Sequence, residues 1–142
     1  MTDPAALLDS AVVGHALGAD SPWKASCQKV LRMAEEDIFR AYASVEMIQE
    51  IVHHRLRRTG DRLGSVQQAR DAASVCTLLN FDREVLDLAL DLIERIPTIR
   101  GRDAVHAATA LAYGIDRIVS PDRAFDGLPG LSRIDPREFA RN

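Results

Sequence analysis

Short apolar runs alternate along the chain with longer segments in which apolar residues recur every three or four positions. The longer segments are typical of helices that bury one face. They predict helices over 21–36, 45–58, 63–79, 83–95 and 103–113. The short runs predict strands over 5–10, 37–44, 115–120 and 131–135, with a brief extended piece over 79–82. Strands that alternate with helices in this way predict an α/β sandwich around a largely parallel sheet.

Turn-forming residues support several of these boundaries. Ser21 is expected to cap the helix that it opens, with Pro22 in the first turn, and Ser44 to cap the helix that follows the second strand. Gly60 is expected to end that helix. The segment 11–18 predicts a short helix or turn, and 122–130 predicts a turn of helix with a loop.

Size and composition point to one ordinary globular domain, spanning residues 1–142. Apolar residues make up 46% of the 142 residues and charged residues 27%, and the formal net charge is −3. An anionic partner such as nucleic acid would therefore need a local basic patch. Cys27 and Cys76 lie in unrelated segments and predict two reduced thiols. We expect a cytoplasmic protein, because the chain shows neither a signal peptide nor an apolar stretch of about 18 residues that could span a membrane.

Acidic residues stand at or just after the predicted strand ends. Asp9 closes the first strand, Asp122 follows the strand over 115–120, and Asp103 opens an alanine-rich helix. Glu46 and Glu50 share a face of the helix after the second strand. Each acid alone is accounted for by a helix cap, the helix dipole or a surface ion pair. Sites in parallel α/β sheets form at the carboxyl ends of strands, so acids gathered there would repel one another unless they shared a cation. Mg²⁺ or Mn²⁺ suits such oxygen ligands.

Four stretches, in this order and spacing, resemble those of the PIN-domain family, and specifically of VapC-type toxin ribonucleases. They are LLDSAVVGHALG, YASVEMIQEIVHHR, GRDAVHAATALAYG and IDRIVSPDRAFDGLPGLSRIDP, and the likeness runs from about residue 5 to 139. The resemblance implies a three-layer α/β/α sandwich with a short, mostly parallel sheet.

The resemblance also implies which residues form the site. The four catalytic and metal-binding acids of the family correspond to Asp9, Glu50, Asp103 and Asp122, and Glu50 is chosen over Glu46 because it stands six residues after Ser44. Asp126 corresponds to an accessory ligand. Ala11 departs from the family, which commonly has Asn, Ser or Thr at this position, and this implies that a supporting hydrogen bond is either missing or partly supplied by Ser10.

By the same resemblance, the protein is a Mg²⁺- or Mn²⁺-dependent endoribonuclease that cleaves RNA phosphodiester bonds. It further implies a VapB-type antitoxin as partner and a homodimer. The densest basic run, 53–62, holds Arg55, Arg57, Arg58 and Arg62, which are candidates for RNA phosphate binding. The same run is equally typical of a solvated helix face or of a surface for an acidic partner.

Two alternatives remain open. Glu50 and His53, like Asp103 and His106, have the acid–histidine spacing of di-iron helical bundles, which need a further Glu from each of two other helices. The predicted strands argue against a bundle, and we expect His106 to pack under the sheet edge or to bond a backbone carbonyl. The other alternative is a PIN-like module that binds RNA or a partner without cutting. The presence of all four acids argues against it, and Ala11 argues for it.

Overall fold

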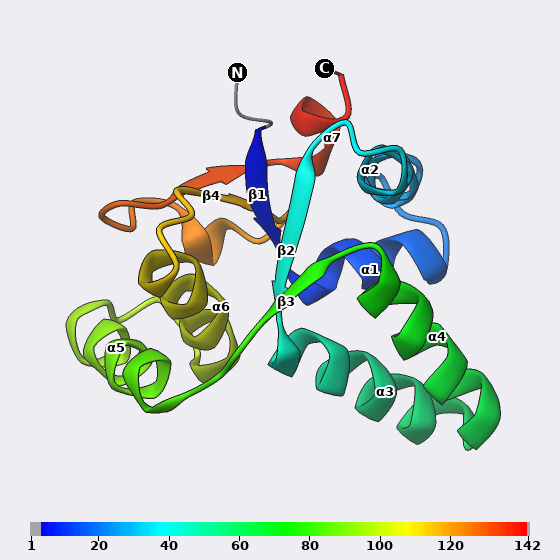
Figure 1. Cartoon of the computed structure of the whole chain (residues 1–142), viewed down its shortest axis with the longest axis horizontal. Helices are drawn as coiled ribbons and strands as arrows, with labels where there is room; N and C mark the ends of the chain where they lie inside the picture. Colours follow the sequence, from blue (N-terminus) through cyan, green and yellow to red (C-terminus); the bar gives the residue numbers. More distant parts are fainter. Residues whose placement is uncertain (1–3, 142) are drawn as a thin grey trace.

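A five-stranded parallel sheet forms the centre of the protein (Figure 1). The computed structural model describes residues 4–141. The strands lie in the order β3-β2-β1-β4-β5. They are β1 (Ala5–Leu8), β2 (Arg40–Ser44), β3 (Thr77–Leu79), β4 (Arg117–Val119) and β5 (Ser132–Ile134). All four strand pairings are parallel, which confirms the predicted α/β class.

Helices cover both faces of this sheet. They are α1 (Ser10–Leu17), α2 (Lys24–Glu35), α3 (Val45–Thr59), α4 (Arg62–Ser74), α5 (Arg83–Arg95), α6 (Gly101–Ala112) and α7 (Pro136–Phe139), with a short 3₁₀ helix η1 (Arg123–Phe125). In Figure 1, α1 to α4 lie on one side of the strands, and α5 and α6 lie on the other. The order of helices and strands produces the three layers that the sequence predicts.

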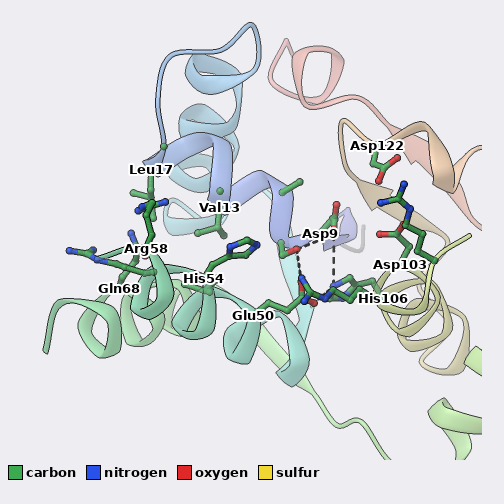
Figure 2. Close-up of a pocket in the computed structure, with 18 of the residues that line it drawn as sticks. Asp9, Val13, Leu17, Glu50, His54, Arg58, Gln68, Asp103, His106 and Asp122 are labelled. Atoms are coloured by element: carbon green, nitrogen blue, oxygen red, sulfur yellow. Dashed lines mark hydrogen bonds and ion pairs between the residues drawn. The ribbon is translucent and has the colours of Figure 1, made fainter. Parts of the chain in front are cut away.

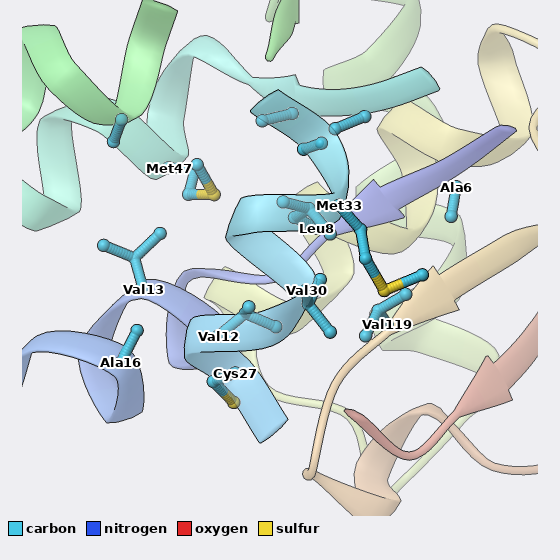
Figure 3. Close-up of a cluster of buried hydrophobic side chains, with 14 of the residues drawn as sticks. Ala6, Leu8, Val12, Val13, Ala16, Cys27, Val30, Met33, Met47 and Val119 are labelled. Atoms are coloured by element: carbon cyan, nitrogen blue, oxygen red, sulfur yellow. The ribbon is translucent and has the colours of Figure 1, made fainter. Parts of the chain in front are cut away.

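Alternate side chains of the central strand supply two separate apolar cores. Ala6 and Leu8 of β1 point into the core beneath α1 to α4, together with Met47 and Val30 (Figure 3). Leu7 points the other way, into the core beneath α5 and α6. Both faces of β1 are therefore buried, which is typical of a parallel sheet covered on each side.

The alanine-rich helix α6 packs closely between the sheet and α5. Ala104, Ala107, Ala108 and Ala110 are all 0% exposed. Because alanine side chains are short, they let the helix axis approach the strands. This approach positions the amino end of α6, with Asp103 in its first turn, close to the strand ends.

Several predicted caps are confirmed. The Ser44 hydroxyl accepts a hydrogen bond from the Glu46 backbone N–H at 3.1 Å, and α3 ends at Gly60, whose φ of 68° is left-handed. The cap predicted at Ser21 is wrong. Its hydroxyl is used in the turn before α2, where it accepts from the Trp23 backbone N–H, and Trp23 takes the cap position.

The predicted helix over 63–79 is too long. The helix ends at Ser74, and Thr77–Leu79 forms β3, which pairs with β2. Val75 and Leu79 continue the helical spacing of apolar residues, so local periodicity does not reveal the break, whereas the neighbouring strand does. The short helix α7 was not predicted; Asp135 caps it by accepting from the Arg137 backbone N–H.

Within residues 4–141, no helix is both long and apolar enough to cross a membrane. Residues 1–3, on which the expectation of no signal peptide partly depends, lie outside the described residues.

Candidate active site

The four acids singled out in the sequence line one cavity at the carboxyl ends of the strands (Figure 2). Asp9 directly follows β1, and Asp122 follows β4. Glu50 projects from α3 and Asp103 from the first turn of α6. The cavity has a volume of about 730 Å³ and also reaches between α1, α3 and α4. Residues up to 113 positions apart in sequence thus share one site, as sheet topology predicts.

Asp9 is the most enclosed of the four acids. It is 4% exposed, and its carboxylate accepts a hydrogen bond from the Ser120 hydroxyl at 2.8 Å. Its backbone N–H donates to the Val119 carbonyl at 3.2 Å, which ties the residue to β4. Burial raises the pKa of Asp9 more than the nearby His106 and the Ser120 hydrogen bond lower it.

Glu50 is held by two side chains. One oxygen, Oε1, lies 2.8 Å from His106 Nε2, and the other, Oε2, accepts from the Ser10 hydroxyl at 3.1 Å. Burial alone would raise the pKa of Glu50, but the bonds to His106 and Ser10 outweigh it and lower the pKa. The carboxylate is therefore ionised and fixed in orientation.

His106 is the partner of this carboxylate and is 1% exposed. Burial would lower the pKa of its imidazole, but Glu50, Asp9 and Asp103 together raise it. Its second ring nitrogen, Nδ1, is buried and has no hydrogen-bond partner among the described residues. The histidine therefore links the acid of α3 to the helix that carries Asp103.

Asp103 and Asp122 lie on the more open side of the cavity, apart from the Asp9 and Glu50 pair in Figure 2. Partial burial, followed by the negative charges of Asp122 and Asp9, raises the pKa of Asp103 to about 6. Asp122 is exposed and caps η1, where its carboxylate accepts from the Ala124 backbone N–H at 2.9 Å. Asp122 is thus held by a backbone N–H, whereas Asp9 and Glu50 are held by side chains.

Comparison with known proteins identifies the family. The PIN domain family matches residues 6–131. A VapC ribonuclease of Mycobacterium bovis is 33% identical over 130 residues, or 90% of this chain and 98% of that protein. This chain belongs to the PIN-domain VapC family. Ribonuclease VapC7 of Mycobacterium tuberculosis is 30% identical over 139 residues, covering 92% of the VapC-family chain described here and 90% of the relative.

Solved structures share the fold of this VapC-family protein. VapBC-1 from nontypeable Haemophilus influenzae matches with a TM-score of 0.72 at 11% identity, over 94% of this chain and 98% of that chain. VapBC2 from Rickettsia felis, bound to a DNA fragment from its promoter, matches with a TM-score of 0.71 at 13% identity, over 92% and 97% of the two chains. At such identities the likeness concerns the fold, and it confirms the PIN-like arrangement predicted from the sequence.

Some expectations about the site need correction. The burial expected for His106 is confirmed, but its partner is a carboxylate and not a backbone carbonyl. The di-iron bundle is wrong because the fold is built on a parallel sheet, and the exposed His53 does not line the cavity that contains Asp9. Ser10, expected to compensate for Ala11, does supply a hydrogen bond in the site, and the bond goes to Glu50.

The basic run is divided by the structure. Arg55 and Arg58 line the cavity, whereas Arg57 and Arg62 are exposed outside its lining. Asp126 also lies outside the lining and forms an ion pair with Arg133, with Nε and Oδ1 2.7 Å apart.

The sequence analysis assigned no role to several residues of the site. They include Ser120, Arg100 and Arg102, and the last two line the cavity at the amino end of α6. Ser120 stands within the quoted stretch IDRIVSPDRAFDGLPGLSRIDP, two positions before Asp122, so its place next to a strand end was the available signal.

Proposed function

We propose that this VapC-family protein is an endoribonuclease that uses Mg²⁺ or Mn²⁺ held by Asp9, Glu50, Asp103 and Asp122. One observation carries the proposal. Four acids from four separate segments line a single cavity, in a chain that is 33% identical to a protein named a VapC ribonuclease. Metal-dependent hydrolysis of a phosphodiester explains why carboxylates of like charge are gathered there.

The residues present suit a divalent cation by their chemistry and charge. All four offer hard oxygen ligands, and the pKa of Asp103 rises to about 6, through burial first and then the charges of Asp122 and Asp9. In the arrangement of residues 4–141, no group of three or more His, Cys, Asp or Glu side chains is close enough to hold a metal. The residues therefore fit a divalent cation by the type of donor atom that they offer. When bound, the metal would polarise the phosphodiester and lower the pKa of a water molecule.

The residues around the acids have supporting roles. Ser120 fixes the Asp9 carboxylate, and Ser10 and His106 fix that of Glu50. Such supporting bonds orient ligands and are commonly worth about 10- to 100-fold in activity or metal affinity. Arg100 at one end of the cavity, and Arg55 and Arg58 at the other, would bind RNA phosphates on either side of the cleaved bond.

We also infer that the protein is the toxin of a toxin–antitoxin pair. A structural neighbour from Klebsiella pneumoniae is described as a toxin–antitoxin complex, and it matches with a TM-score of 0.69 at 17% identity over 92% of this chain and 97% of that chain. The same inference includes a VapB-type antitoxin as partner and a homodimer. We also infer that the protein acts in the cytoplasm, where RNA is found, and that residues 1–142 form a single PIN domain. Asp126 would act as an accessory metal ligand after its ion pair with Arg133 is broken.

A cleavage assay tests the proposal. Purified protein should cut single-stranded RNA when Mg²⁺ or Mn²⁺ is present and stop when EDTA is added. The Asp9→Asn variant should lose more than about 100-fold in rate, because even residues that only orient metal ligands are worth about 10- to 100-fold. The exposed Asp91 on α5 provides a matched control as Asp91→Asn, which should cut as the wild type does. Undiminished cutting by Asp9→Asn would contradict the assignment, and RNA binding without any cutting would favour the non-catalytic alternative.

A further inference from the structure

A second, smaller cavity adjoins the active site and is lined mainly by polar side chains. Its volume is about 160 Å³, and its lining includes Glu46, Gln49, Glu50, His53, Arg102 and Val105. Glu50 and Arg102 also line the larger cavity, so the two cavities lie next to each other. A group bound in the smaller cavity would lie next to the candidate catalytic acids.

The geometry of α3 explains why these polar groups meet. Residues 46, 49, 50 and 53 follow the i, i+3, i+4, i+7 spacing and therefore share one face of the helix. That face turns toward the amino end of α6, from which Arg102 comes. Gln49, His53 and Arg102 are exposed and Glu46 is half-buried, so their donors and acceptors are accessible to a ligand.

We propose that this cavity binds one guanine base of the RNA, next to the bond that is cut. The inference rests on the proposed ribonuclease function and adds a sequence preference to it. Ligand pockets for larger molecules typically measure about 300–1,000 Å³, so a cavity of about 160 Å³ suits a single base. Single-stranded RNA is commonly recognised in this way, through bases turned out of the stack and read along their edges.

Guanine fits the charges of the lining better than the other bases. It carries two neighbouring donors, N1–H and the N2 amine, which match the two oxygens of the Glu46 carboxylate. Its O6 and N7 acceptors match the paired N–H groups of an arginine such as Arg102. Adenine, cytosine and uracil each offer only one donor group along the corresponding edge, and they would leave a carboxylate oxygen without a partner.

The test compares guanosine with inosine, which lacks the N2 amine. Cut sites mapped in a randomised RNA pool should show guanosine enriched at one fixed position beside the cut. At that position inosine should lower kcat/KM by about 10- to 100-fold, as expected for a lost hydrogen bond to a charged group. In Glu46→Gln the guanosine-to-inosine ratio should fall to near one.

A matched control variant separates base recognition from helix stability. Glu84 is exposed and lies in the first turn of α5, and Glu46 lies in the first turn of α3. Glu84→Gln therefore changes the helix dipole interaction similarly and should keep the wild-type ratio. Thermal unfolding of both variants shows whether each is folded under the conditions of the assay.

Binding measured with Ca²⁺ as the only divalent ion distinguishes failure of this site from failure of the ribonuclease assignment. Fluorescence anisotropy of labelled oligonucleotides should show the same preference for guanosine and its loss in Glu46→Gln. A protein that shows this pattern but cuts nothing would contradict the ribonuclease and support the base site. A wild type without a preference for guanosine, or a Glu46→Gln variant that retains it, would overturn the base site.

Discussion

The two sides of the active-site cavity are built differently. On the enclosed side, Asp9 and Glu50 accept hydrogen bonds from Ser120 and Ser10, and Glu50 is paired with a buried histidine. On the open side, partial burial and then the negative charges of Asp122 and Asp9 raise the pKa of Asp103 to about 6. Side-chain hydrogen bonds thus orient Asp9 and Glu50, whereas Asp122 accepts from a backbone N–H of η1 and Asp103 keeps a raised pKa.

The largest effect on stability should come from removing His106, the buried partner of the Glu50 carboxylate. His106→Ala leaves the Glu50 carboxylate largely buried without its main partner, and removing one member of a buried pair costs about 3–5 kcal/mol. We expect a loss near the lower end, about 3 kcal/mol in the free energy of unfolding, because the Glu50 side chain is 11% exposed. Urea denaturation measures it. His54→Ala, at an exposed position of α3, is the control and should cost less than about 0.5 kcal/mol. Equal losses in the two variants would contradict a structural pair.

A smaller loss is expected at Ser120. Ser120→Ala removes the 2.8 Å hydrogen bond to the buried Asp9 carboxylate, and hydrogen bonds to charged groups are worth about 1.5–3 kcal/mol. Urea denaturation should show a loss of about 2 kcal/mol, and cleavage should fall about 10- to 100-fold because Asp9 is no longer oriented. Ser132→Ala, at an exposed position of β5, should leave both properties unchanged. Wild-type cleavage by Ser120→Ala would show that Asp9 needs no such support.

The acids of the open side should make the stability of the metal-free protein depend on pH. An acid whose pKa is higher in the folded protein favours folding while it is protonated, so its contribution is lost as the pH rises. Burial first, and then the charges of Asp122 and Asp9, raise the pKa of Asp103 from 3.8 to about 6, against the opposing effect of His106 and Arg100. Metal-free stability should therefore fall by about 1 kcal/mol across that window. Asp9 and His106, whose pKa values are also raised, shift stability in the same direction.

Thermal unfolding from pH 4 to 8, in EDTA and in Mg²⁺, measures this effect. Mg²⁺ should remove the decline, because a ligand that binds only the folded state stabilises it. In EDTA at pH 8, Asp103→Asn should unfold at a higher temperature than the wild type. A wild type that gains stability from pH 4 to 7 in EDTA would contradict the raised pKa of Asp103.

The smallest effect is expected at Asp126. Its pair with Arg133 involves a carboxylate that is 52% exposed, and exposed pairs contribute about 0–1 kcal/mol. Asp126→Asn should therefore change the rate of cleavage by less than about twofold, and its stability by less than about 1 kcal/mol. A rate loss as large as that of Asp103→Asn would place Asp126 among the metal ligands after all.

Patterns in the sequence predicted the parts of the fold that depend on local spacing. The parallel sheet, the helix from Ser44 to Gly60 and the close-packed alanine helix could all be expected, because strand runs, caps and small residues are local signals. The strand Thr77–Leu79 could not, since only its pairing with β2 distinguishes it from the end of a helix. The four acids were found from strand ends and the family resemblance, whereas the bond between His106 and Glu50 joins residues 56 positions apart and depends on how α3 and α6 pack.

The central claim is that the acids of both sides hold one divalent cation site, and calorimetric titration with Mn²⁺ at pH 8 tests it most directly. Wild type and Asp126→Asn should bind Mn²⁺ with similar Kd. Asp9→Asn and Asp103→Asn, one from each side, should each weaken binding by at least about 10-fold. Binding that is unchanged in both variants would contradict the account.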